Sequence, residues 1–345
     1  VFKFGIVLYL CWHGLSLWSL ALLTLSESVV RNLLVACWST RFCDWTGWPN
    51  PFRADRLMFL SLLSYSSAVF LMMLADLFRF QIDAAVIAWF LPEASGAITT
   101  YAIGFKLLLL SSTTIGVVWS VLIPRFSGLA ARGNMDELWS LWRRSCLHTG
   151  LLTVYGLTNI AVFGLPFLKL WLKQPWVLDS YKVMMLSLPA YVISLLSGPS
   201  GGLLAGLGRL RWQTAITLVE AVCNVGLSIY LVQFYGIFGV CLGTVIPMIV
   251  FRGMIFPLVL RKETGLALTD YYLAHRTSIS TGLLYALLIA GFAFIDYHSY
   301  LHFFAACGLS TLVFVALLYV ARKDTREVLL EIGTRIKDLF GRRLH

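Results

Sequence analysis

The sequence predicts an all-α, polytopic membrane protein built as a bundle of about nine transmembrane helices. Hydrophobic residues make up 59% of its 345 residues, the mean hydropathy is +0.81, and only 13% of the residues are charged. A typical soluble domain carries about 25% charged residues. Because charges this sparse cannot cover the surface of a water-soluble globule, lipid must cover much of the molecule.

Nine apolar stretches are long enough to cross a bilayer, which takes about 20 residues of helix. They cover residues 4–25, 57–90, 98–124, 146–172, 183–205, 214–234, 237–260, 278–295 and 300–320. Short turns at 92–96, 235–236 and 296–299 predict antiparallel hairpins. The longest linker, 26–56, contains Pro49, Asn50 and Pro51, and we expect it to lie on the membrane surface. The tail 324–343 is either an amphipathic interfacial helix or a solubilising tail.

The basic residues indicate the orientation. Of 27 lysines and arginines, 20 fall in alternate connecting segments and the tail, four on the opposite side and three inside spans. The positive-inside rule then places the N-terminal end outside and the C-terminus in the cytoplasm. The net charge of +10 is explained by this topology, so we expect no nucleic-acid partner.

Enzyme and metal signatures are missing from the sequence. The seven cysteines are scattered without a CxxC pair, the six histidines are dispersed, and there is no HExxH, GxSxG or Walker A motif. We therefore expect no metal, no cofactor, no catalytic residue and no internal ATP motor.

Ionisable residues inside apolar spans are costly and are candidates for function. Asp76, Arg79 and Asp83 share one face of a helix at spacing i, i+3, i+7. Counted from the turn at 92–96, Asp83 and Lys106 lie at nearly the same depth, so we expect them to pair or to share a cavity. They form either a structural ion pair or the polar lining of a transport pathway.

A second set of polar residues lies further along the chain. Gln213, Glu220 and Asn224 share one helical face, and Arg252 lies at a depth matching Glu220 across the turn at 235–236. Arg252 either faces this strip or extends to the cytoplasmic interface beside Arg261, and the second reading is slightly favoured.

The segment 195–206 reads LLSGPSGGLLAG and predicts a break in its helix. Gly198, Pro199, Gly201 and Gly202 fall inside an otherwise apolar span. Small residues let helices pack closely, which is the favoured reading. The alternative is a hinge for alternating access.

Two stretches carry a family resemblance. Residues 77–141 contain Asp83 inside the membrane, the short turn 91–96 and Tyr101 at the start of the next helix. That helix ends in the sequence Pro124, Arg125, Phe126 and Ser127, and the acidic pair Asp136 and Glu137 follows. Residues 203–247 contain the glycine-rich turns 206–208 and 235–240. In this order, the features resemble the C-terminal lobe of polysaccharide flippases of the multidrug/oligosaccharidyl-lipid/polysaccharide exporter superfamily.

The resemblance implies a two-lobe transporter. Residues 1–56 would hold the last helix of the first lobe and a cytoplasmic linker, 57–262 the second six-helix lobe, and 263–345 a trailing helix pair and tail; about five further helices would precede them. Such a protein flips undecaprenyl-diphosphate-linked oligosaccharide, as in O-antigen and lipopolysaccharide synthesis, across the bacterial inner membrane. It is not an enzyme and needs no cofactor.

The resemblance also suggests roles for the charged residues. Arg79, Lys106 and Arg252 would meet the diphosphate, and Asp83 or Glu220 would carry H⁺ or Na⁺. One alternative is a cation-coupled drug antiporter of the same superfamily, but acids should then dominate its pathway. A less favoured alternative is an integral-membrane polysaccharide enzyme, which would need large polar loops.

Overall fold

The computed structural model describes residues 17–39, 56–91 and 94–321. The chain forms two compact units, Val1–Ser61 and Leu62–His345, and each is described by itself. In the described residues all regular structure is helical, which confirms the predicted all-α class.

Helix α2 (Leu17–Ser39) is the described helix of the first unit. It differs from the prediction, because the expected span 4–25 covers only its beginning and the expected linker 26–56 is helical as far as Ser39. The sequence from 26 to 39 contains no glycine or proline that would end a helix. The segment with Pro49 and Pro51 and the tail 324–343 lie outside the described residues.

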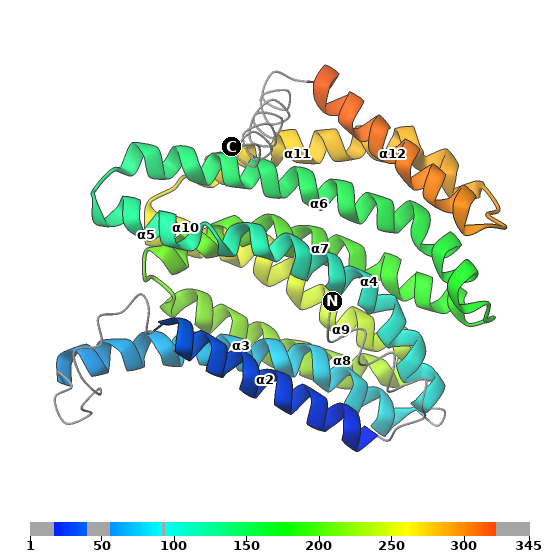
Figure 1. Cartoon of the computed structure of the whole chain (residues 1–345), viewed down its shortest axis with the longest axis horizontal. Coiled ribbons are helices and arrows are strands. Elements are labelled where there is room, and N and C mark those ends of the chain that lie inside the picture. The colour runs from blue at the N-terminus through cyan, green and yellow to red at the C-terminus, as the bar shows by residue number, and fades with distance from the viewer. Residues whose placement is uncertain (1–16, 40–55, 92–93, 322–345) are drawn as a thin grey trace. The chain divides into compact units, whose positions relative to one another are not determined.

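The remaining helices follow one another with short connections (Figure 1). They are α3 (Arg56–Phe90), α4 (Ala94–Ser120), α5 (Ile123–Ala131), α6 (Met135–Leu172), α7 (Val177–Gly206), α8 (Arg211–Tyr235), α9 (Ile237–Val250), the π-helical η2 (Phe251–Ile255), α10 (Phe256–Thr264), α11 (Leu268–Ile289), the 3₁₀ segment η3 (Ala290–Phe294) and α12 (Tyr300–Ala321). In the described part, seven helical stretches between residues 96 and 320 are long and apolar enough to span a membrane. They match the last seven of the nine predicted spans.

Many apolar side chains on these helices are exposed. Val222 on α8 is 72% exposed, and Leu283 and Leu287 on α11 are also exposed. Exposed apolar surface of this extent needs a partner, and for helices of this length lipid is that partner. The chain is a multi-pass membrane protein.

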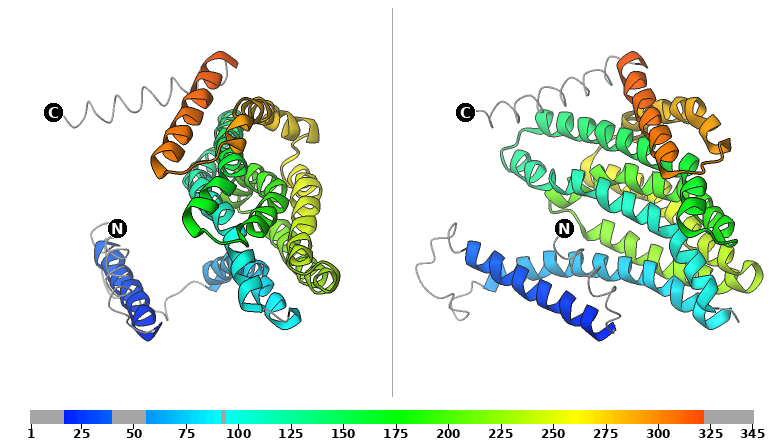
Figure 2. Two further views of the ribbon diagram at one scale, coloured as in Figure 1. Left: turned by 90° about the vertical axis from the view of Figure 1, so that its right-hand side faces the viewer. Right: turned by 45° about the vertical axis from the view of Figure 1, so that its right-hand side comes forward.

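Helix α7 lies at the centre of the second unit and contacts α4, α6 and α9 (Figure 1). Its buried Val183 and Tyr191 belong to one apolar core together with Val86 of α3, Phe105 of α4 and Val240 of α9. A second core joins α11 and α12 to α6, and Figure 2 shows these three helices side by side. The first core therefore holds α3, with Asp76 and Asp83, and α4, with Lys106, against α7.

Helices α8 and α9 form the predicted hairpin. Gly236 adopts φ 56° between them, a conformation that glycine adopts without steric cost. A Cβ on Gly243 would lie 2.5 Å from the backbone of Ser228, so the absence of a side chain lets the helices approach closely. This tight hairpin sets the relative depth of the residues on its two arms.

Candidate functional site

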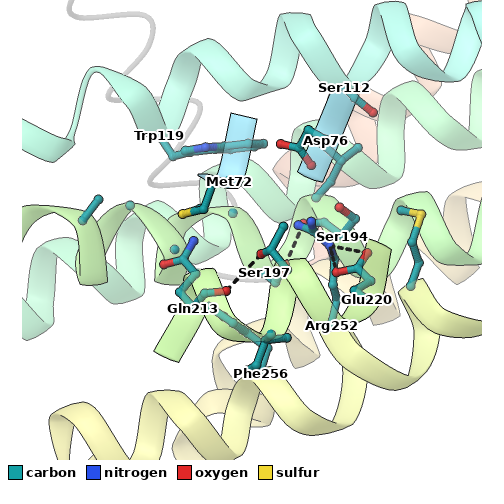
Figure 3. Close-up of a pocket in the computed structure, with 18 of the residues that line it drawn as sticks. Met72, Asp76, Ser112, Trp119, Ser194, Ser197, Gln213, Glu220, Arg252 and Phe256 are labelled. Carbon is teal, nitrogen blue, oxygen red and sulfur yellow. Dashed lines mark hydrogen bonds and ion pairs between the residues drawn. The ribbon is translucent and has the colours of Figure 1, made fainter. Parts of the chain in front are cut away.

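The second unit contains a cavity of about 540 Å³ among α3, α4, α7, α8 and the η2–α10 segment (Figure 3). Its polar lining comes from every one of these walls: Asp76, Ser112, Thr113, Trp119, Tyr191, Ser194, Ser197, Gln213, Thr217, Glu220 and Arg252. The other lining residues are mainly apolar. Apolar walls with a few placed polar groups are typical of binding sites for small molecules or molecular segments.

An ion pair crosses the cavity wall between α8 and η2. The Arg252 Nε donates to both carboxylate oxygens of Glu220, each at 3.2 Å (Figure 3). The Glu220 side chain is 1% exposed and that of Arg252 is 25% exposed. The depth matching across the hairpin is confirmed, and the favoured reading, in which Arg252 extends to the interface beside Arg261, is wrong.

A π-helical turn positions Arg252. Pro257 has no N–H to offer the carbonyl of Gly253, four residues earlier. That carbonyl instead accepts a hydrogen bond of 3.1 Å from the Tyr272 hydroxyl of α11. The local widening to η2, with the Phe256 N–H bonded to the Phe251 carbonyl, is of a kind often found at functional sites.

The predicted break in α7 is absent. The helix runs from Val177 to Gly206 through Pro199, so the prediction of a broken helix is wrong. A Cβ on Gly198 would lie 2.8 Å from the Trp119 ring, and one on Gly201 would lie 3.1 Å from Gln213 Nε2. A Cβ on Gly202 would be 3.5 Å from the Trp119 carbonyl oxygen. These glycines let cavity-lining side chains rest on α7, in line with the close-packing reading.

Gly198→Ala should therefore destabilise the protein although alanine favours a helix. The added methyl group must displace the Trp119 ring, and overpacking of this kind costs about 1–3 kcal/mol. Gly226→Ala is the matched control, because a Cβ there meets nothing within 4 Å, and it should gain about 0.5–1 kcal/mol. Thermal unfolding in detergent measures both. Equal gains from the two variants would contradict the contact with Trp119.

Asp83 lies in a separate buried cluster. Its side chain is 1% exposed and accepts hydrogen bonds from the Tyr101 hydroxyl of α4 and from the Thr244 hydroxyl of α9, the latter at 2.9 Å. Asp83 is not among the residues that line the cavity. The sequence singled out Tyr101 only within the resemblance and missed Thr244, because a threonine in an apolar helix often bonds its own backbone, as Thr244 also does to Val240.

The expected pairing of Asp83 with Lys106 is not found. Lys106 is exposed on α4, and its side chain makes no hydrogen bond or ion pair in the part of the chain that the structure describes. Asn224 is fully buried one turn from Glu220, and its amide atoms have no hydrogen-bond partner among the described residues. The side chain of Arg79 lies outside the description. Of the predicted pathway residues, the structure therefore brings Glu220 and Arg252 together.

Among the described residues no group of three His, Cys, Asp or Glu side chains could hold a metal ion. The arrangement instead offers one guanidinium, two carboxylates (Asp76 and Glu220), hydroxyls, an amide and an indole around a cavity. These groups can bind and orient a polar or anionic group inside a membrane.

Fold and site together define a multi-pass helical membrane protein with a charged cavity among its apolar helices. A family model described as "Polysaccharide biosynthesis protein" matches residues 1–179. The match covers more than half of the chain, and the chain belongs to this family.

The fold is also similar to that of a solved structure. A solved structure titled "Lipid II flippase MurJ, inward closed conformation" matches with a TM-score of 0.58 and 15% sequence identity, over 73% of this chain and 52% of that one. The chain thus spans about half the length of that flippase. No curated protein matches the sequence. At this identity the likeness concerns the fold alone.

Proposed function

We propose that this chain belongs to a transporter that flips undecaprenyl-diphosphate-linked oligosaccharide from the cytoplasmic to the outer leaflet of the bacterial inner membrane, supplying cell-surface polysaccharide such as O-antigen. The family and the flippase fold support the proposal. The single observation that carries it is the cavity with Arg252 held on its wall by Glu220. Residues 57–262 form the second lobe in this proposal, and the C-terminus is cytoplasmic.

The cavity chemistry fits such a substrate. A diphosphate needs a cation, and Arg252 presents charge-assisted N–H donors inside the apolar helices. Sugars need hydrogen-bonding and aromatic surfaces, which Ser194, Gln213 and Trp119 offer. Lys106, exposed on α4, and Arg79 are further candidates for contact with the diphosphate as the lobes move.

Energy for transport would come from an ion gradient or from downstream consumption of the product. Asp83 and Glu220 are the buried carboxylates available to carry H⁺ or Na⁺. Of the two, Asp83 has hydroxyl ligands around it, whereas Glu220 is engaged by Arg252. Either carboxylate is a candidate for the ion, and Asn224 on α8 is a candidate for the pathway.

The test is a substitution that fills the cavity, introduced into the gene for this protein in the cells that carry it. Ser194→Trp places a large side chain in the cavity, and surface polysaccharide should fall at least about tenfold, as expected when a positioned site is lost. Lipid-linked donor should accumulate on the cytoplasmic leaflet. Val219→Trp is the control, because Val219 is exposed on α8 and a tryptophan there should leave polysaccharide unchanged.

Other outcomes would select the alternatives. Normal surface polysaccharide together with raised sensitivity to cationic drugs would indicate the drug antiporter. A donor of altered chemical structure would indicate the membrane enzyme. Immunoblots of membrane fractions separate either result from loss of the protein.

A further inference from the structure

A second cavity lies at the corner between α5 and α6, away from the one described above. It measures about 610 Å³ and is lined by residues of these two helices and of the turn between them: Pro124, Arg125, Gly128, Leu129, Arg132, Glu137, Ser140, Leu141 and Arg144. It shares no residue with the first cavity. Its lining contains three arginines and one glutamate, so its formal charge is +2.

The arginines are available to a ligand. Within the described residues, the side chains of Arg125, Arg132 and Arg144 make no hydrogen bond or ion pair, and all three residues are exposed. The one acid is already engaged, because Glu137 accepts a hydrogen bond of 2.8 Å from the Asn134 side chain and its backbone N–H donates to Asn134 at 3.3 Å. This cap at the start of α6 fixes the carboxylate at the helix end, no ion pair joins it to the arginines, and the pocket keeps a net formal charge of +2.

The position of the pocket points to a lipid. It lies at the end of the apolar stretch Gly96–Ala131, where a span meets the headgroup region. Val117 and Val121 of the same stretch are 59% and 65% exposed. They precede Arg125 by eight and four residues, with Val117 on α4 and Val121 in the turn between α4 and α5, just ahead of the pocket in the chain. An acyl chain along these valines would bring its headgroup to the arginines.

From these observations we propose that the α5–α6 pocket binds the phosphate of an anionic membrane phospholipid. Arginine guanidinium groups match phosphate oxygens in bidentate geometry, and basic pockets at the membrane interface bind anionic headgroups. The site is separate from the proposed substrate cavity, so it stands or falls independently of the transport proposal.

The experiment measures binding of phosphatidylglycerol to the purified full chain in nanodiscs by native mass spectrometry, with phosphatidylcholine as the zwitterionic reference. Each of Arg125→Gln, Arg132→Gln and Arg144→Gln should weaken phosphatidylglycerol binding about fivefold, and the triple variant about a hundredfold. The control triple Arg143→Gln, Arg261→Gln, Arg276→Gln removes the same charge from exposed residues outside the pocket and should keep most of the binding.

A second variant tests shape without changing charge. A Cβ on Gly128 meets nothing within 4 Å, so Gly128→Leu fills the pocket, retains all three arginines and favours the helix. It should weaken phosphatidylglycerol binding at least about tenfold, as expected for a blocked site. Equal loss from the pocket and control triples would overturn the proposal. Displacement by millimolar inorganic phosphate without any preference for phosphatidylglycerol would indicate a soluble anion and would overturn the lipid assignment.

Discussion

Arg252→Met should destabilise the protein by about 3–5 kcal/mol, the loss expected when one partner of a buried ion pair is removed. Glu220→Gln should cost less, about 1–3 kcal/mol. The difference follows from burial, because the Glu220 side chain is 1% exposed whereas Arg252 is 25% exposed and borders the cavity. A carboxylate left behind is shielded from water, but a guanidinium left behind is partly hydrated. Chemical unfolding in detergent, followed by tryptophan fluorescence, measures both.

The double variant Glu220→Gln, Arg252→Met separates stability from transport. With neither charge present, stability should return to within about 1 kcal/mol of the parent. Surface polysaccharide should still be lost if Arg252 contacts the diphosphate as proposed. Additive losses of stability in the double variant would show that the two residues are not coupled. Restored stability with normal polysaccharide would remove Arg252 from the pathway.

Removing the two hydroxyls that bond to Asp83 should also reduce the stability of the protein by a large amount. Tyr101→Phe and Thr244→Val each remove a hydrogen bond to a buried carboxylate, and each should cost about 1.5–3 kcal/mol. Adding Asp83→Asn to the Tyr101→Phe, Thr244→Val background should recover part of that loss, because the buried position no longer holds a charge. Lys106→Gln is the control and should stay within about 0.5 kcal/mol, since Lys106 is exposed.

Exchanging the charges of Asp83 and Lys106 tests whether these two residues pair. Asp83→Lys with Lys106→Asp should fail to accumulate in membranes, because the described hydrogen-bond partners of Asp83 are hydroxyls. Membrane yield measured by immunoblot checks this. Restored yield in the swapped variant would make Lys106 the partner of Asp83 and contradict the observed contacts.

Some of the site could be predicted because the contacts are local to one hairpin. Glu220 and Arg252 lie on the two arms that meet at Gly236, and residues equally far from a tight turn lie at equal depth. Counting along the chain therefore placed the pair correctly, and the ion pair confirms it. The same counting failed for Lys106, because equal depth does not set the rotation of a helix about its own axis. In the structure α4 turns Tyr101, and not Lys106, toward Asp83.

The helix at Pro199 shows a second limit of local reasoning. Glycine and proline predict a break, but tertiary packing in the apolar core keeps α7 continuous from Val177 to Gly206. Helix propensity is a weak preference that surrounding contacts override. The reading of these glycines as close-packing positions agrees with the structure, because a Cβ on Gly198 would overlap the Trp119 ring.

The sequence by itself determined the class of this protein: long apolar stretches and sparse charge require helices in lipid, because only helices satisfy their own backbone there. Tertiary structure alone decided which charged groups share a cavity and which are enclosed by hydroxyls. Thr244 reaches Asp83 across 161 positions of chain, and the arginines of the α5–α6 corner form a pocket only when the two helices fold back on each other. Such contacts depend on how whole helices rotate and cross, which is set by packing summed over many side chains.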